Sequence, residues 1–342
     1  MSNSLFQAAK TATRHVQTRA YSTPRHLMSI ADLSSTEFAR LVLNGAEHKR
    51  AFKAGTASEK LKSSLAGPAV ALLFSKRSTR TRVSTESAIA MMGGRPMFLG
   101  KDDIQLGVNE TLLDTSKVIS SMTSCIVARV DQHSDVTGLA EHSSVPVING
   151  LSADFHPLQT IADFLTIHEA FPASNLSKGS LGLEGRKVAW IGDSNNVLFD
   201  LAIGCFKMGV DIAVASPKGY GIPDRMRSLI LSSGTSSKLV ETTVPEVAIK
   251  DADILVTDTW VSMGQEEEVK KRLQAFDGYQ ITSELAKRGG AKEDWKFMHC
   301  LPRHPEEVTD EVFYNSRSLV FQEAENRLWA AIGQYSPLLA FG

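Results

Sequence analysis

Residues 70–82 read VALLFSKRSTRTR, and this stretch indicates both the fold class and a binding site. Its apolar half, which ends at Phe74, is typical of a buried strand. The hydroxyl of Ser78 or of Thr79 can cap the helix that we expect to run through Thr85–Met92. A buried strand that leads directly into a helix is the unit from which parallel α/β sheets are built.

Apolar runs of the same kind alternate with amphipathic stretches from about residue 65 to residue 320. The expected strands are Val70–Phe74, Cys125–Val130, Val145–Ile148, Val188–Ile191, Val210–Ala215, Lys238–Val244, Ile254–Thr257 and Lys296–Cys300. Near-continuous apolar strands separated by helices belong to parallel sheets that are covered on both faces, and their crossovers are right-handed. The pattern therefore predicts an α/β protein with two doubly wound domains, each a parallel sheet flanked by helices.

The length of 342 residues exceeds what one hydrophobic core usually holds, so we expect two folded domains. We place the first domain at residues 25–165 and the second at residues 166–320. Their connection is expected to be a helix over 155–171, followed by a loop rich in Ser, Gly and Leu over 172–185. Residues 321–342 contain a long stretch that is apolar on one face, which we expect to form a helix that packs back on the first domain.

The composition is ordinary for a soluble globular protein, with 42% hydrophobic and 22% charged residues. A formal net charge of −1 gives no overall attraction to nucleic acid or to an anionic membrane, so we expect neither as a partner. No apolar run approaches the roughly 18–20 residues that a membrane span needs. The three cysteines, Cys125, Cys205 and Cys300, are widely spaced, which indicates neither a disulfide framework nor a metal-ligand pair.

The first 24 residues differ from this background because they are basic and contain no carboxylate. They include Lys10, Arg14 and Arg19 among many Ser and Thr residues, and the first acidic residue is Asp32. This composition is typical of a mitochondrial transit peptide, with residues 5–16 as its amphipathic helix. We therefore expect the protein to act in the mitochondrial matrix, and a disordered basic tail is the alternative.

Four cations lie within seven residues where the first strand gives way to its helix. They are Lys76, Arg77, Arg80 and Arg82. Free backbone N–H groups and the positive end of the helix dipole point to the same place, at the carboxyl end of a parallel strand. Hydroxyls and guanidinium groups suit the oxygens of phosphate, whereas the Gly-x-x-x-x-Gly-Lys pattern of a nucleoside triphosphate loop is absent. The stretch predicts a phosphate site, and a solvated basic helix start is the alternative.

Four consecutive residues of this stretch resemble the carbamoyl-phosphate signature of the aspartate and ornithine carbamoyltransferase family. These residues are Ser78, Thr79, Arg80 and Thr81. The resemblance implies that they hold the phosphate of carbamoyl phosphate and that Thr81 also reaches the carbonyl oxygen. It also implies that the first domain binds carbamoyl phosphate, that the second domain binds the amine acceptor, and that the protein is a homotrimer with active sites at subunit interfaces.

Two further segments match the pattern of the same family. Arg129 lies at the end of an expected strand, and His156 precedes Pro157, the first residue of an expected helix. Proline is preorganised at this position and holds the preceding residue extended, so His156 and Gln159 are aimed from a fixed loop. Acyl transfer needs hydrogen-bond donors where negative charge develops on the carbonyl oxygen. The resemblance implies that Arg129 and His156 contact this oxygen and that Gln159 binds the carbamoyl amide.

The expected strand 254–257 delivers Asp258 to its carboxyl end, and a turn with Ser262 and Met263 follows. A carboxylate can pair with an ammonium group, and the hydroxyl and N–H groups of the turn can bind a carboxylate; these are the two ends of an amino acid. The run resembles the loop that recognises ornithine in members of the family, which implies transfer to the ornithine side-chain amine to give citrulline. The residues assigned to ornithine are Asn196, Asp258, Ser262 and Met263.

The run 299–302, with the sequence His-Cys-Leu-Pro, also matches the family. The resemblance implies that Cys300 lies beside the reacting amine and carbamoyl phosphate, and that the Leu301 backbone contacts carbamoyl phosphate, often with a cis bond before the proline. It assigns Arg327 to carbamoyl phosphate as well. Gln105 stands where some relatives carry a histidine that reaches a neighbouring subunit, so its role stays open. The residues expected to act directly in the reaction are Cys300, Arg129 and His156.

We expect no metal and no organic cofactor, because positioning and charge complementarity can carry this reaction. Within the family, a transferase acting on putrescine or on acetylated ornithine is the alternative; an aspartate enzyme would need cations in the loop after Asp258. A nicotinamide-dependent dehydrogenase would share the alternation of strands and helices, but its Gly-x-Gly-x-x-Gly pattern is absent. A catalytically silent binding protein with this fold is the remaining alternative.

Overall fold

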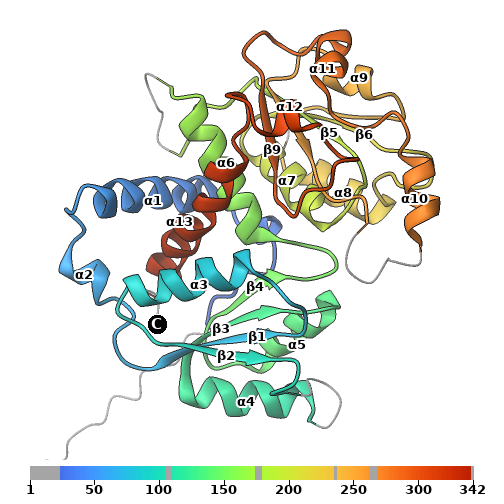
Figure 1. Ribbon diagram of the computed structural model, residues 1–342. Coiled ribbons are helices and arrows are strands. Elements are labelled where there is room, and N and C mark those ends of the chain that lie inside the picture. Colours follow the sequence, from blue (N-terminus) through green and yellow to red (C-terminus); the bar gives the residue numbers. More distant parts are fainter. Residues whose placement is uncertain (1–23, 105–109, 174–178, 235–236, 262–267, 340–342) are drawn as a thin grey trace, which may run out of the picture.

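Two parallel sheets, each covered by helices, make up the computed structural model (Figure 1). The structure describes residues 24–104, 110–173, 179–234, 237–261 and 268–339. Helices α6 (Pro157–Ala170) and α13 (Val320–Leu339) lie between the two sheets and connect them. The prediction of an α/β protein with two doubly wound domains is therefore confirmed.

The first sheet has the strand order β2-β1-β3-β4, and all its neighbouring strands are parallel. The strands are β1 (Ala69–Phe74), β2 (Pro96–Gly100), β3 (Thr123–Arg129) and β4 (Val147–Leu151). The other helices around it are η1 (Ile30–Asp32), α1 (Ser35–Lys53), α2 (Glu59–Lys62), α3 (Arg80–Met91), α4 (Leu112–Met122) and α5 (His133–His142). The chain runs from β1 to β2 on one side and to β3 on the other, so a crevice forms at the carboxyl ends of β1 and β3.

The second sheet has the order β7-β6-β5-β8-β9 and is also parallel throughout. The strands are β5 (Lys187–Ile191), β6 (Asp211–Ala215), β7 (Leu239–Thr242), β8 (Ile254–Thr257) and β9 (Lys296–His299). The helices around it are α7 (Asn196–Lys207), α8 (Asp224–Ser232), α9 (Pro245–Ile249), α10 (Val269–Ala275), α11 (Ser283–Gly289) and α12 (Asp310–Phe313). Strand order reverses between β5 and β8, which opens a second crevice at their carboxyl ends.

The C-terminal helix packs back on the first domain, as the sequence predicts. Helix α13 contacts α1, α3 and α6, and it crosses α1 closely because Gly45 and Gly333 face each other. A side chain at Gly333 would place its Cβ 2.8 Å from the Gly45 nitrogen, so only glycine fits there. One buried apolar cluster runs from β1 through α6 and α13 to β5 and α7, so the two domains share a continuous core.

Strand and helix boundaries differ from the sequence predictions by one to three residues at several ends. Strand β2 was not predicted; it begins with Pro96, lies at the edge of its sheet and is partly exposed, so it lacks the apolar pattern of a central strand. Ser78 rather than Thr79 supplies the cap of α3, because its Oγ accepts a hydrogen bond from the Thr81 N–H at 3.2 Å. The domain boundary predicted after residue 165 falls inside α6 and stays a prediction.

Two predicted features, the targeting helix over residues 5–16 and the role of Gln105, lie outside the described residues. Among the helices that the structure describes, none is both long and apolar enough to cross a bilayer.

Candidate active site

The predicted phosphate-binding residues lie at the start of α3, facing the second domain. Thr81 is buried, and the Arg80 guanidinium reaches across to the second domain, where its Nη2 donates to the Leu301 carbonyl oxygen at 2.5 Å. Arg327 on α13 donates from Nη2 to the Thr81 hydroxyl at 3.1 Å and from Nη1 to the Gln159 Oε1 at 2.6 Å. Three segments far apart in the sequence therefore meet at the amino terminus of one helix.

Three arginines, Arg80, Arg129 and Arg327, act on one another electrostatically at this point. Burial, followed by the nearby Arg80 charge, lowers the pKa of Arg129 to about 10. Burial likewise lowers the pKa of Arg327 to about 10, and Arg129 and Arg80 contribute. Because like charges gathered in a buried site repel, a bound anion would stabilise all three.

Several donors here have no partner among the described residues. The Nε atoms of Arg129 and Arg327 and the Nδ1 atom of His156 are buried without a hydrogen bond. A buried polar atom without a partner costs about 1–3 kcal/mol, so this cluster suits a ligand rich in oxygen. The structure thus brings together the side chains of Arg129, His156, Thr81 and Arg327, as predicted.

His156 is the residue before Pro157 at the start of α6, and its backbone is held from the second domain. Its N–H donates to the Asp200 Oδ2 at 2.8 Å, while the Asp200 Oδ1 accepts from the Ser29 hydroxyl at 2.7 Å and the Ile30 N–H at 2.9 Å. Burial, followed by the charges of the surrounding arginines, lowers the pKa of His156 well below its ordinary value. The imidazole is therefore neutral at physiological pH and can donate one N–H to a carbonyl oxygen.

The free energy of unfolding should depend on pH through Asp200. Burial raises its pKa to about 7, so between about pH 4 and pH 7 the folded protein keeps a proton that the unfolded chain has lost, and stability falls as pH rises. Asp200→Asn should remove this contribution, about 1.4 kcal/mol for each pH unit across that window. Urea unfolding at several pH values measures the difference in slope. Asp131→Asn, at a more exposed carboxylate, serves as control, and parallel profiles for wild type and Asp200→Asn would contradict the assignment.

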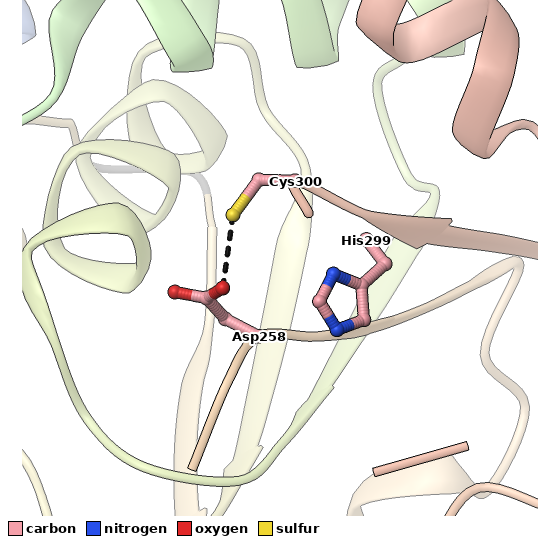
Figure 2. Close-up of side chains that lie close together, drawn as sticks. All are labelled: Asp258, His299 and Cys300. Carbon is pink, nitrogen blue, oxygen red and sulfur yellow. Dashed lines mark hydrogen bonds between the residues drawn. The ribbon is translucent and has the colours of Figure 1, made fainter. Parts of the chain in front are cut away.

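The acceptor side of the site lies at the carboxyl ends of β5, β8 and β9. Asp258 is buried, and its Oδ2 accepts from the Asn195 Nδ2 at 2.7 Å while its Oδ1 accepts from the Cys300 thiol at 3.0 Å (Figure 2). Burial, and then the Asp258 charge, raises the pKa of Cys300 well above its ordinary value. Cys300 is therefore a neutral thiol that donates to Asp258, and the geometry gives no support for a thiolate nucleophile.

Of the other residues predicted to bind the acceptor, the structure describes only Asn196. Asn196 begins α7, but its Nδ2 donates to the Ser152 carbonyl oxygen at 2.6 Å, whereas Asn195 holds Asp258. Ser262 and Met263 lie outside the described residues, so their contacts with ornithine stay predictions. Asn195 was not predicted, because in the sequence it is one of several polar residues that follow a strand; its side chain also caps α7.

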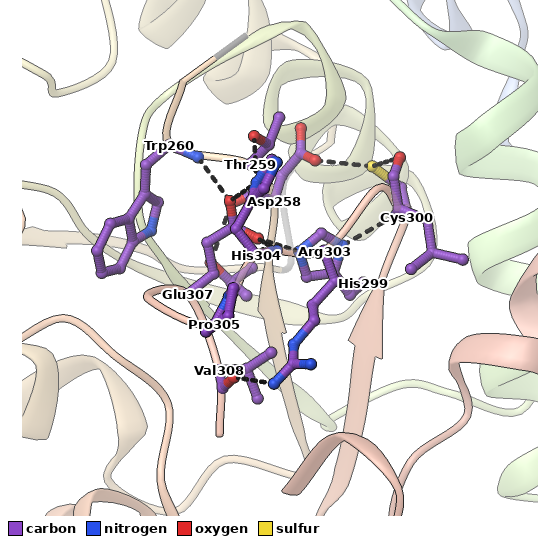
Figure 3. A network of polar contacts seen from close by, with 12 residues as sticks. Asp258, Thr259, Trp260, His299, Cys300, Arg303, His304, Pro305, Glu307 and Val308 are labelled. Atoms are coloured by element: carbon purple, nitrogen blue, oxygen red, sulfur yellow. Dashed lines mark hydrogen bonds and ion pairs between the residues drawn. The ribbon is translucent and has the colours of Figure 1, made fainter. Parts of the chain in front are cut away.

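A buried carboxylate that the sequence did not indicate organises the loop after β9. Glu307 accepts hydrogen bonds from His299 Nε2 at 3.0 Å, from the His304 N–H at 2.7 Å and from the Trp260 N–H at 3.2 Å (Figure 3). His299 Nδ1 in turn accepts from the Leu301 N–H at 2.9 Å. The Leu301–Pro302 bond is cis, as the family pattern implied. This network sets the Leu301 carbonyl oxygen where Arg80 meets it.

Asp258, His299 and Cys300 are also a possible metal-ligand set, since one ligand atom of each lies within 4.8 Å of the others (Figure 2). Each of these groups already has a hydrogen-bond partner: the thiol donates to Asp258, and both ring nitrogens of His299 are engaged. An ion would have to replace these hydrogen bonds, so the arrangement fits a hydrogen-bonded site better than a metal centre. The expectation that the reaction needs no metal stays a prediction.

Comparison with protein families agrees with this geometry. Residues 25–169 match the carbamoyl-phosphate-binding domain of the aspartate/ornithine carbamoyltransferases, and residues 184–333 match their aspartate/ornithine-binding domain. The chain belongs to the aspartate/ornithine carbamoyltransferase family. Within this family, it is 69% identical over 313 residues to the mitochondrial ornithine carbamoyltransferase of Emericella nidulans, covering 90% of this chain and 87% of that one. It is 54% identical to the Schizosaccharomyces pombe protein of the same name, covering 92% and 94%.

Solved structures of the family have the same fold. The crystal structure of a mitochondrial ornithine carbamoyltransferase from Coccidioides immitis matches with a TM-score of 0.87 and 63% identity, over 93% of this chain and 98% of that one. The ornithine carbamoyltransferase from Pyrococcus furiosus matches with a TM-score of 0.82 and 40% identity, over 92% and 96%. Both matches extend over both domains of this chain.

Proposed function

We propose that this protein transfers the carbamoyl group of carbamoyl phosphate to the side-chain amine of ornithine, giving citrulline and phosphate. The observation that carries the proposal is the meeting of Arg80, Arg129 and Arg327 with the neutral His156 at the amino terminus of α3. This cluster suits a phosphorylated donor with a polarised carbonyl group. The relatives, which carry the name ornithine carbamoyltransferase, support the same assignment.

The donor would occupy the buried cluster of cations and N–H groups. Its phosphate oxygens would accept hydrogen bonds from the start of α3 and from two arginines, and its carbonyl oxygen would face Arg129 and His156. The carbamoyl amide would face Gln159 and the backbone of Leu301. The residues proposed to bind carbamoyl phosphate are Ser78, Thr79, Arg80, Thr81, Arg129, His156, Gln159, Cys300, Leu301 and Arg327.

The acceptor would lie between the donor and the carboxyl ends of β5 and β8. The Asp258 carboxylate suits the ammonium group of an amino acid, and the neutral Cys300 thiol lies beside it. The residues proposed to bind ornithine are Asn196, Asp258, Ser262 and Met263. Asn195 joins this set as the residue that orients Asp258.

The reaction follows from this arrangement. The neutral side-chain amine attacks the carbonyl carbon, and the negative charge that develops on the carbonyl oxygen is stabilised by Arg129, His156 and Thr81. A carbon–nitrogen bond forms, the bond between the carbonyl carbon and the phosphate oxygen breaks, and one proton of the amine leaves with phosphate. Both substrates are held by groups already in place, so the rate enhancement comes from positioning and electrostatics.

The rate should depend on pH through the acceptor amine. An amine of this type has a pKa of about 10.4 and attacks only when neutral, so kcat/KM for ornithine should rise about tenfold per pH unit between pH 6 and pH 8. Steady-state rates over that range measure this rise. Binding of inorganic phosphate over the same range controls for changes in the donor site, and a flat rate profile would contradict a rate that depends on the free amine.

The N-terminal segment and the surface of the first domain bear on where the protein acts and how it assembles. The basic segment before residue 25 and the mitochondrial names of the relatives support a mitochondrial protein, and we propose the matrix as its compartment. We also propose a homotrimer. Exposed apolar side chains on the first domain, among them Met97 on β2 and Val118 and Met122 on α4, support a subunit contact there. Helix α4 lies at the end of the molecule away from the second domain (Figure 1).

The decisive experiment follows isotope from labelled carbamoyl phosphate into products with ornithine as acceptor. Labelled citrulline, formed in the same amount as phosphate, is the expected result. Putrescine and acetylated ornithine are assayed in parallel, and no observation in the structure favours either of them. Label that enters neither citrulline nor any product of these amines would reject carbamoyl transfer.

A further inference from the structure

Two carboxyl groups that have no part in the reaction described above lie beside Gln159. Asp163 is one turn further along α6, and Glu323 is on α13. The Gln159 Nε2 donates to the Asp163 Oδ1 at 2.8 Å and to the Glu323 Oε1 at 3.0 Å. All three side chains are buried, and the Glu323 Oε2 is fixed by the His299 N–H at 2.9 Å.

These contacts determine which way the Gln159 amide faces. Its nitrogen points to two carboxyl groups, which accept, and its oxygen points to the Arg327 guanidinium, which donates at 2.6 Å. The opposite orientation would set the amide oxygen against the carboxyl oxygens and the amide nitrogen against a cation. Both N–H bonds of the amide are therefore used inside the protein, and only its oxygen is left with a free lone pair.

The two carboxyl groups hold this arrangement together because each accepts a hydrogen bond from the Gln159 amide nitrogen. Burial raises the pKa of Asp163 to about 7, and burial followed by the nearby Asp163 charge raises the pKa of Glu323 well above its ordinary value. A buried carboxyl pair that keeps a proton avoids the cost of two unpaired charges.

The oxygen of Gln159 lies on the donor side of the site. Arg327 connects it to Thr81 of the phosphate-binding residues through one guanidinium group. We infer that Asp163 and Glu323 are positioning residues that hold the Gln159 oxygen toward the donor, so that the site selects a carbonyl group carrying N–H over one carrying a methyl group. This inference rests on the proposed function, because it takes carbamoyl phosphate as the donor.

The chemical reason is that a carbamoyl NH₂ group donates to an amide oxygen, whereas the methyl group of acetyl phosphate cannot. The two donors have nearly the same shape and the same phosphate, so the arginine cluster binds both. A site built to accept an N–H discriminates strongly against an analogue that lacks it. If the amide could turn, its NH₂ would face the donor amide and the discrimination would weaken.

The test compares affinities for carbamoyl phosphate and acetyl phosphate, measured by calorimetry without ornithine. Asp163→Ala should weaken carbamoyl phosphate binding about tenfold and change acetyl phosphate binding less than twofold. Asp163→Asn keeps an acceptor oxygen and should return the ratio of affinities to within about threefold of wild type. If Asp163→Ala does not fold, the measurements are made on Asp163→Leu, which is also apolar and is closer to aspartate in size. The ratio of its affinities for carbamoyl phosphate and acetyl phosphate is then compared with that of the wild type.

Glu169→Ala is the matched control. Glu169 lies on the same helix and also contacts α13, through Gln322 and Asn326, but it does not touch Gln159. It should lower stability and leave the ratio of affinities unchanged. The inference is overturned if Asp163→Ala keeps the wild-type ratio, or if it weakens both donors equally. A wild-type protein that makes no citrulline would reject the proposed function instead, so the two failures are distinct.

Discussion

Arg80→Ala is expected to lower kcat/KM for carbamoyl phosphate by about a hundredfold to a thousandfold. Its guanidinium lies at the start of α3 beside Arg129 and reaches the Leu301 carbonyl oxygen, so it faces the donor from both domains. Loss of one preorganised donor to a developing charge costs about 3–4 kcal/mol. Steady-state kinetics with each substrate varied in turn measures the loss, and calorimetry with inorganic phosphate measures the part that comes from binding.

Arg82→Ala is the control for this prediction. Arg82 lies two residues further along the same helix, but it pairs with Glu86 at 2.9 Å, and its guanidinium carbon lies 3.6 Å from the centre of the Phe98 ring. Its removal takes the same charge from the same helix and should leave kcat/KM within about threefold of wild type. Near-normal turnover in Arg80→Ala, or an equal loss of kcat/KM in both variants, would contradict the assignment of Arg80 to the phosphate site.

The features that the sequence predicts correctly are local in the chain. A strand, a capping hydroxyl and interleaved arginines stand within residues 70–82, and proline follows His156 directly. Such patterns determine local backbone geometry whatever the rest of the fold does, so the start of α3 and the entry into α6 could be placed from residue order alone. Both are observed.

The buried carboxylates could not be predicted in this way. Asp163 and Glu323 are 160 residues apart, and each reads as an ordinary polar position in an amphipathic helix. A carboxylate that is buried against a distant helix has the same local pattern as one that faces water. The position of Arg327 could not be predicted from its local sequence either, because an arginine in a helix usually faces solvent. It lies beside Thr81 because α13 packs against α3.

Asp258→Asn is expected to lower kcat/KM for ornithine more than a hundredfold. The carboxylate is buried at the end of β8 and held by Asn195 and Cys300, so it presents a fixed negative charge to the ammonium group of the acceptor. Leaving a charged group unpaired in a desolvated site costs about 3–5 kcal/mol. Affinity for carbamoyl phosphate should stay within about threefold of wild type, because the donor site is built from other segments, and the two constants are measured separately by kinetics and calorimetry.

The opposite end of the same strand offers the control for Asp258. Asp253 precedes β8, is also buried, and pairs with Arg186 at 2.8 Å and with Lys292 at 2.7 Å. Asp253→Asn separates a buried carboxylate from two partly exposed cations and should lower the free energy of unfolding by about 1–2 kcal/mol, while kcat/KM for ornithine changes little. The two variants therefore separate the charge that supports the fold from the charge that binds the acceptor. Equal effects on ornithine in both would mean that Asp258 acts through the stability of β8, and its role in recognising the amine would have to be given up.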